Sequence, residues 1–270
     1  AALSMEPGNT RASFGLGQAY EQRSRCARVF NYRMELMTEP GTLGKLGFPP
    51  LTEQGYQDVQ LALDAYAKSV ASYPRYPEAY YRQGLLHFVS GRQADARAAL
   101  EQAVGDDRAS VAPAVLLAYV YLEDGNTQAA AAQIERIRSA AGDPGNALIL
   151  GASGVLEFRN GRLDSAESML AQGVSRPDAP AYLFKILGDV RLARGAHDQA
   201  LEAYQQAAYR DMESVLSRDA LGNMLRLAGQ PSSAAGYYAA AVAGNPNLTR
   251  ARFGLGSALL QSGSTSQALG

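Results

Sequence analysis

The 270-residue chain has no tryptophan, one cysteine and two histidines, and these shortages exclude several kinds of site. A single cysteine cannot form a disulfide within the chain, and Cys26 is most simply a small buried hydrophobic residue. His87 and His197 lie far apart in the sequence, so we do not expect them to share a metal ion with Cys26. The sequence therefore predicts no metal site and no cofactor.

The chain also has no excess of either charge, because 25 basic and 26 acidic residues leave a formal net charge of −1. This balance gives no reason to expect nucleic acid or an anionic membrane as a partner. The longest apolar run, Ala112 to Leu122, is far shorter than the ~20 residues that cross a bilayer, so we expect no membrane insertion by this segment. Lysine is much scarcer than arginine, which fits a GC-rich bacterial genome.

Glycine is abundant, and it recurs with alanine at a nearly fixed step. A small residue is followed seven residues later by a glycine, and five residues after that by an alanine. The steps along the alanine series are 34, 36, 34, 34 and 34, and its members are Ala96, Ala130, Ala166, Ala200, Ala234 and Ala268. The small residues are Gly84, Ala118, Gly154, Gly188, Gly222 and Gly256, and the glycines that follow them are Gly91, Gly125, Gly161, Gly195, Gly229 and Gly263. A period near 34 is typical of stacked helical hairpins.

The spacing within one unit predicts two helices joined by a tight turn. Pro77 suits the first turn of a helix, and Gly91 supplies the backbone freedom that ends it. Ala96 and Leu100 have the spacing of a second helix. Gly84 and Ala96 are small because the two antiparallel helices must approach closely there.

This pattern resembles the tetratricopeptide repeat family, which favours a Leu-Gly pair followed by glycine, alanine, an aromatic residue, alanine and proline. Two consecutive units match it with Phe184, Leu187, Gly188, Gly195, Ala200, Tyr204 and Ala207, then Leu221, Gly222, Gly229, Ala234, Tyr238, Ala241 and Pro246. The departures are Ala118, Ile137, Gly173 and the missing tryptophan. The resemblance covers essentially the whole chain. It implies an all-α fold, a right-handed superhelical solenoid of about seven to eight helical hairpins, incomplete at both ends.

We expect residues 1–270 to form a single solenoid. The predicted parts are a tail of a preceding repeat (1–9), a repeat (10–42), a degenerate repeat (43–76) with an irregular loop (40–56), full repeats at 77–110, 111–146, 147–180, 181–214 and 215–248, and a truncated repeat (249–270). The degenerate repeat follows from the separation of Gly17 and Gly84, which is nearly two periods. We take the chain as part of a longer protein.

The loop at 40–56 is predicted from its prolines and glycines. Pro49 and Pro50 remove two backbone donors, and three further glycines lie nearby. Its apolar residues are expected to fold against neighbouring helices or to contact a partner; they are Leu43, Leu46, Phe48 and Leu51.

Residues suited to catalysis are scarce. We interpret His87 as a packed core histidine and His197 as a solvated residue in a turn. The glycine pairs Gly151–Gly154 and Gly15–Gly17 follow no strand, so neither completes a phosphate-binding motif. The sequence therefore predicts that the chain is not an enzyme.

The resemblance implies that the first helix of each repeat lines a concave groove. The residues it places there are Tyr81, Phe88, Tyr119, Phe158, Lys185, Asp189, Asp219, Asn223, Arg226 and Arg250. For the apolar members the alternative is packing between helices, and for the polar members it is a solvated face. Five polar members are expected to converge on one patch: Lys185, Asp219, Asn223, Arg226 and Arg250.

Some members of the family clamp the terminal carboxylate of a chaperone peptide with a set of lysine, asparagine and arginine residues. Lys185, Asn223 and Arg250 match that set. Asp189 and Gly254 do not, and Asp219 adds a second acid that should repel a carboxylate. We therefore reject this clamp as the main function.

The function we expect is a non-catalytic scaffold that binds a partner protein or peptide in its groove, within a bacterial pilus or secretion, envelope or exopolysaccharide-export assembly. An alternative is a regulatory or substrate-recruiting module of a larger enzyme, and self-association is a third. The sequence leaves the partner, the oligomeric state and the compartment open, whether periplasm, envelope or cytoplasm.

Overall fold

The computed structural model describes residues 9–39, 51–106 and 110–264, and this part of the chain forms fourteen helices and no strand. The all-α prediction is confirmed. The helices are α2 (Thr10–Ser24), α3 (Cys26–Glu35), α4 (Glu53–Ser72), α5 (Pro77–Val89), α6 (Gln93–Asp106), α7 (Val111–Glu123), α8 (Thr127–Ala140), α9 (Ala147–Arg159), α10 (Leu163–Val174), α11 (Ala181–Ala193), α12 (His197–Arg210), α13 (Val215–Leu227), α14 (Pro231–Gly244) and α15 (Thr249–Gln261).

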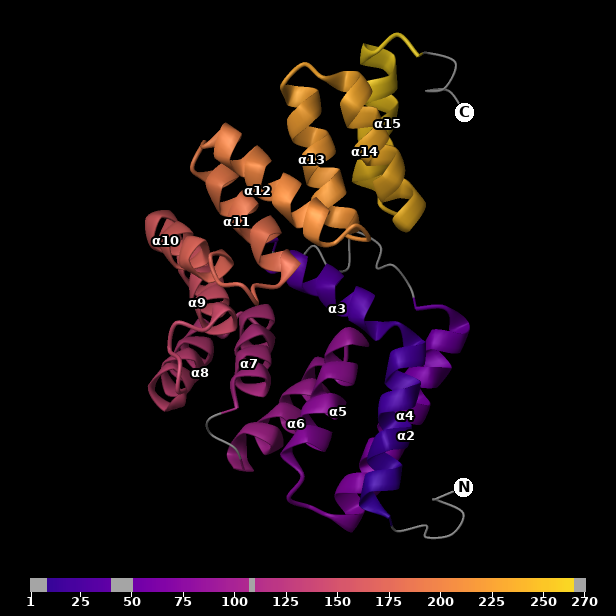
Figure 1. The fold of residues 1–270 in the computed structure, drawn as a ribbon, viewed down its shortest axis with the longest axis vertical. Helices are drawn as coiled ribbons and strands as arrows, with labels where there is room; N and C mark the ends of the chain where they lie inside the picture. Colours follow the sequence, from indigo (N-terminus) through magenta and orange to yellow (C-terminus); the bar gives the residue numbers. More distant parts are fainter. Residues whose placement is uncertain (1–8, 40–50, 107–109, 265–270) are drawn as a thin grey trace. The chain divides into compact units, whose positions relative to one another are not determined.

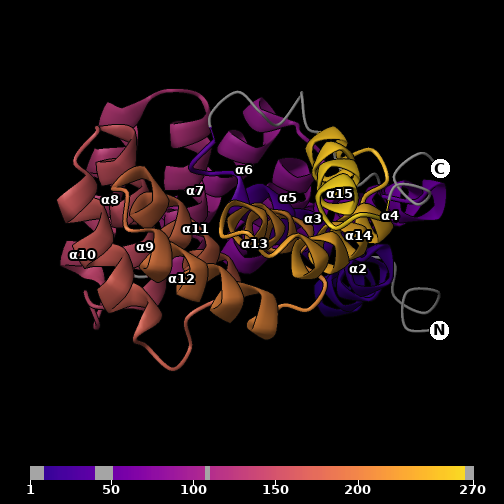
Figure 2. The same ribbon diagram turned by 90° about the horizontal axis from the view of Figure 1, so that it is seen from above.

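The chain divides into two compact units. Unit 1 comprises residues 1–30 and 51–156, and unit 2 comprises residues 31–50 and 157–270. In unit 1, α2 packs against α4, α5 against α6 and α7 against α8 (Figure 1). In unit 2, α11 packs against α12, α13 against α14 and α14 against α15, which Figure 2 shows from above.

The first helices of six repeats begin at positions that follow the period of the sequence. The first helices begin at Pro77, Val111, Ala147, Ala181, Val215 and Thr249, which are the first residues of the repeats predicted from the sequence. The glycine that follows each of these helices has a φ between +73° and +81°. Because residues with a Cβ rarely adopt this left-handed conformation, the glycines are required by the turn.

The first hairpin is built differently from the prediction. The residue that faces Gly17 of α2 is Tyr66 of α4, and a Cβ on Gly17 would come within 2.5 Å of its ring. Tyr204 makes the same contact with Gly188 and follows it by about half a period, whereas Tyr66 follows Gly17 by almost a period and a half. The repeats predicted at 10–42 and 43–76 are thus wrong as separate hairpins. Instead, α2 and α4 form one hairpin, with an insertion of almost one repeat length between them.

This insertion carries α3. The chain turns out of α2 at Arg25, the one non-glycine residue with a positive φ among the described residues (58°). The backbone N–H of Cys26 then donates to Ser24 Oγ at 3.2 Å. A left-handed backbone conformation at a non-glycine residue costs about 1 kcal/mol, so the surrounding contacts must favour it.

The irregular loop predicted at 40–56 ends earlier than expected, because α4 begins at Glu53. Thr52 caps α4 by accepting from the N–H of Gly55 at 3.0 Å, so residues 53–56 are helical. Leu51 is buried, as expected for a residue that folds against helices. The rest of the predicted loop, residues 40–50 with Leu43, Leu46 and Phe48, lies outside the described residues, as do residues 1–8 and 265–270.

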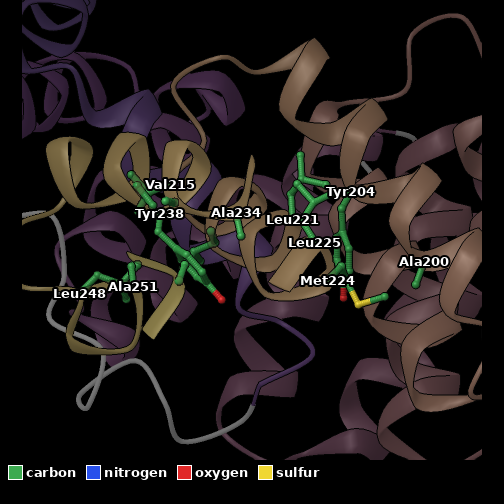
Figure 3. Packing of buried hydrophobic residues seen from close by; sticks show 14 of the residues in the cluster. Ala200, Tyr204, Val215, Leu221, Met224, Leu225, Ala234, Tyr238, Leu248 and Ala251 are labelled. Atoms are coloured by element: carbon green, nitrogen blue, oxygen red, sulfur yellow. The ribbon is translucent and has the colours of Figure 1, made fainter. Parts of the chain in front are cut away.

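The core cluster of unit 2 includes alanines, leucines and three tyrosines, two of which, Tyr204 and Tyr238, come from the second helices of hairpins (Figure 3). Tyr204 of α12 belongs to the same buried cluster as Leu221 and Leu225 of α13. Tyr238 of α14 fills the space left by Gly222 of α13, where a Cβ would approach the tyrosine ring within 3.0 Å. The glycine of the first helix therefore fits the aromatic ring of the second.

Two glycines of α2 provide a test of the α2–α4 hairpin. Gly17→Ala should lower the free energy of unfolding by about 1–3 kcal/mol, because the methyl group would overlap Tyr66. Gly15→Ala is the matched control: it meets no atom within 4 Å and should raise stability by up to about 1 kcal/mol through helix propensity. Urea unfolding of both variants measures this. Equal effects would contradict the α2–α4 contact.

Candidate functional site in the C-terminal unit

A short segment from the insertion lies against the helices of unit 2. We call residues Asn31–Glu39 the docked segment. Every residue from Tyr32 to Thr38 is buried, including the charged Arg33 and Glu35, which are 2% exposed. Buried charged groups need partners. For Glu35, these partners come from the helices of unit 2.

Glu35 is bound at the N-terminus of α13. Its Oε1 accepts hydrogen bonds from Ser214 Oγ at 2.5 Å and from Ser217 Oγ at 3.0 Å. Ser214 is also the N-cap of α13, where its Oγ accepts from the N–H of Ser217 at 3.0 Å. Burial raises the pKa of Glu35 to about 7, and the serine hydroxyls and Lys185 offset this only in part.

Lys185 of α11 is 1% exposed, and all three donors of its ammonium group are used. Nζ donates to the backbone O of Glu35 at 2.9 Å, to Glu39 Oε1 at 3.0 Å and to Asp189 Oδ2 at 2.8 Å. Burial opposes the charged form, but the carboxylates of Asp189 and Glu39 outweigh it and raise the pKa of Lys185. Two of these three acceptors belong to the docked segment.

Glu39 lies between two cations. Besides Lys185, Arg250 of α15 donates from Nη1 to Glu39 Oε2 at 2.7 Å. Burial opposes ionisation of Glu39, yet the two cations outweigh it and hold its pKa at about 2. Arg250 also pairs with Asp219 of α13, with 2.5 Å between Nε and Oδ2. Burial raises the pKa of Asp219, and Arg250 offsets part of this rise.

Further contacts extend along the docked segment. Arg159 Nε donates to the backbone O of Met37 at 2.9 Å, and the Thr38 hydroxyl donates to Asp189 Oδ2. Asn31 Nδ2 donates to Asp211 Oδ2 at 3.3 Å. The side chains of Tyr32 and Leu36 belong to the hydrophobic core cluster of unit 2. The docked segment is thus held by its backbone, its carboxylates and its apolar side chains together.

A cavity of about 370 Å³ opens beside Glu39. The structure brings six of the ten predicted groove residues to its wall, including all five that were expected to converge. They are Lys185, Asp189, Asp219, Asn223, Arg226 and Arg250. We call these six the polar patch. Tyr204, Tyr238 and Phe253 also line the wall, and Phe253 is 78% exposed.

The four apolar groove residues do not join this cavity. Tyr81, Phe88 and Tyr119 belong to unit 1, and Phe158 is partly buried in unit 2 but does not line the cavity. Phe88 is 0% exposed, with its ring centroid 6.1 Å from that of Phe30, and Tyr119 is 1% exposed. For Phe88 and Tyr119 the prediction of partner contact is wrong in this structure, because a buried ring offers no surface to a partner.

The expectation that Asp189 and Asp219 would repel a carboxylate is also wrong. The carboxylate of Glu39 lies within hydrogen-bond distance of Lys185 and Arg250. Each aspartate is paired with one of these cations, at 2.8 Å for Asp189 and 2.5 Å for Asp219. The acids are therefore neutralised locally, and each cation also binds the carboxylate of Glu39.

Glu35, Glu39, Ser214 and Ser217 were not predicted as site residues from the sequence. The signal that could have found the segment is the spacing of Gly17 and Tyr66, which fits one hairpin interrupted by an insertion. No periodicity could have indicated where the inserted residues dock.

Membrane-spanning helices and metal-binding clusters are two further features that can be examined in the described residues. No described helix is long and apolar enough to cross a membrane, and no group of three His, Cys, Asp or Glu side chains in the described ranges could hold a metal ion. His197 is exposed, whereas His87 is partly buried, and its burial lowers its pKa.

The repeat geometry and the sequence comparisons together define the class of protein. The model of the tetratricopeptide repeat family matches residues 56–113, 115–180, 152–214 and 220–270. The chain therefore belongs to the tetratricopeptide repeat family, whose repeats form protein–protein interaction scaffolds. No curated protein matches the chain.

Several solved structures have a similar fold. The Cut9–Hcn1 hetero-tetramer of APC/C contains a chain with a TM-score of 0.67 and 17% identity, over 95% of this chain and 51% of that one, so this chain spans about half its length. PilF of Pseudomonas aeruginosa has a TM-score of 0.60 and 19% identity over 71% and 88% of the two chains. PilW, described as a type IV pilus biogenesis factor, has a TM-score of 0.57 and 16% identity over 72% and 90%. At these identities the likeness concerns the fold.

The raised pKa of Glu35 predicts a pH dependence of stability. In the folded state Glu35 keeps its proton up to about pH 7, whereas in the unfolded chain it loses it near its ordinary pKa of 4.5. The folded state binds the proton more tightly, so the stabilisation falls as the pH rises through this interval. Between pH 6 and pH 8 the free energy of unfolding should fall by about 1 kcal/mol from this group.

Glu35→Gln should abolish this part of the pH dependence, and urea unfolding at several pH values measures it. The exposed Glu202 of α12 offers the control, since Glu202→Gln should retain the wild-type profile. An unchanged profile in Glu35→Gln would contradict the buried, protonated state of Glu35.

Proposed function

We propose that unit 2 binds a peptide segment of a partner protein in the cavity beside Glu39, and that the polar patch recognises acidic groups of that segment. The observation that carries this proposal is that Lys185 and Arg250 already bind a carboxylate, that of Glu39. The cavity continues from this carboxylate to Asn223, Arg226 and the exposed ring of Phe253.

The wall of the cavity combines features that suit a peptide. Arg226 lies beside Asn223, with 3.2 Å between Nη2 and Oδ1, and both side chains are accessible to some extent. Phe253 is among the most exposed large apolar side chains of the described residues, at 78%. Exposed aromatic and arginine side chains around a cavity are typical of binding sites for proteins.

We also propose that the partner belongs to a bacterial multiprotein assembly. The arginine-rich composition suits a bacterial protein, and the assemblies considered are a pilus or secretion apparatus, an envelope complex and an exopolysaccharide exporter. The pilus proteins among the solved structures share the fold with this chain, so pilus biogenesis is the first of these to test.

A library of displayed peptides selected on the full chain tests the binding site. The selected peptides should be enriched in Asp and Glu, and Arg226→Glu should weaken their binding about tenfold, or about 1.4 kcal/mol, at low ionic strength. The effect should shrink as salt is added, because Arg226 is partly exposed and its charge is screened. Thermal stability should stay nearly unchanged, because Arg226 lies outside the apolar core of unit 2.

The control is Arg252→Glu. Arg252 is an exposed arginine of α15, two residues from Arg250, and it does not line the cavity. Arg252→Glu makes the same change in net charge as Arg226→Glu but outside the cavity, so peptide binding should stay close to that of the wild type. Equal losses in both variants would indicate a general charge effect, and no loss in either would place the binding site elsewhere.

A further inference from the structure

The docked segment occupies unit 2 in the way that a bound peptide would. It is connected to the hairpin of α2 and α4, and it is not one of the repeat helices of unit 2. Its contacts include two carboxyl groups, two backbone carbonyl groups and two apolar side chains, which are groups that any peptide could offer. The structure therefore contains a ligand of unit 2 within the same chain.

The contacts are arranged at helical spacing. Tyr32 and Leu36 are four residues apart and both enter the core cluster, whereas Glu35 and Glu39 are four residues apart and both accept hydrogen bonds from unit 2. Residues three or four apart lie on the same side of a helical turn. The pattern is Tyr-x-x-Glu-Leu-x-x-Glu, and it lies within the docked segment.

We propose that this pattern is the recognition motif of unit 2, that the docked segment is its internal ligand, and that a partner protein binds by placing an acidic segment of the same pattern there in exchange. This inference rests on the proposed function and specifies the chemistry of the partner: an aromatic residue and a leucine four residues apart, and two acidic side chains with the same spacing.

The charge balance favours exchange. When the docked segment leaves, Lys185 loses two of its three acceptors and Arg250 loses one of its two carboxylates. An ammonium group in this site that has lost two of its three acceptors is unfavourable, so the empty site favours any segment that brings acceptors and a carboxylate to the same positions. A neutral or basic segment would leave Lys185 with Asp189 and Arg250 with Asp219 as their remaining carboxylate partners.

Competition with a synthetic peptide tests the exchange. The probe is a fluorescent peptide of residues 29–40, and its binding is followed by anisotropy. It should bind at least tenfold more tightly to Glu39→Lys than to the wild type, because the reversed charge weakens docking of the internal segment. The control Glu202→Lys makes a similar charge reversal at an exposed residue of α12 in the same unit and should behave as the wild type.

Recognition of the carboxylate is tested with the peptide itself. A peptide carrying Glu39→Lys should bind at least tenfold more weakly than the natural one to the Glu39→Lys protein. If Glu39→Lys does not fold, Glu39→Gln keeps the shape of the side chain and should give a smaller effect in the same direction. Equal binding of both peptides, or equal binding to the variant and the wild type, would overturn the proposal.

A thiol in the docked segment reports its release. Thr38 is 7% exposed, and Thr38→Cys in a Cys26→Ala background places the one thiol of the chain inside the docked segment. Excess peptide should raise its reaction rate with a maleimide at least tenfold. Binding that depends on Arg226 but leaves this thiol protected would overturn the exchange and leave the proposed function standing. Absence of any Arg226-dependent binding would count against both.

A second copy of the chain is the competing occupant. If the docked segment of one copy filled the site of another, the wild type would sediment as a dimer that Glu39→Lys dissociates. This result would overturn the proposal that a different protein is the partner. A monomer at all concentrations, with exchange of the peptide, supports the proposal.

Discussion

The close approach of two helices at a residue without a side chain is the constraint on which this fold depends. An aromatic ring or leucine of the second helix occupies the space that a Cβ would fill, as Tyr204 does at Gly188 and Leu100 does at Gly84. The glycine in the turn then reverses the chain. Because the close approach recurs at Gly84, Gly188 and Gly222, and the turn glycine recurs after each first helix from α5 onward, these hairpins repeat in a similar way along the chain.

The same constraint explains how the first hairpin tolerates a long interruption. The contact between Gly17 and Tyr66 depends on the faces of α2 and α4 and not on the length of the chain between them. The entropy of closing a loop grows slowly with its length, so the insertion costs little in that hairpin. The inserted residues can therefore carry a segment with binding contacts of its own, which here lie in unit 2.

The sequence was sufficient for those parts of the fold that periodicity controls. It predicted the turn glycines, the starts of the helices from Pro77 onward and the convergence of Lys185 with Arg250, because repeats convert sequence position into spatial position. The sequence-based prediction failed at the insertion between α2 and α4, where the repeat period no longer indicates spatial position. Two periods between Gly17 and Gly84 suggested two hairpins. The environments of Glu35 and Glu39 depend on partners far along the chain, which are Lys185, Ser214 and Arg250.

The saturated ammonium of Lys185 has a kinetic consequence. A site whose donors are all occupied cannot accept an incoming segment contact by contact until the resident contacts break. If the docked segment must leave first, the observed association rate would rise with partner concentration and then reach a plateau equal to the rate of that departure. On that plateau the rate of partner binding would be set by the segment from Asn31 to Glu39, and more partner would not increase it.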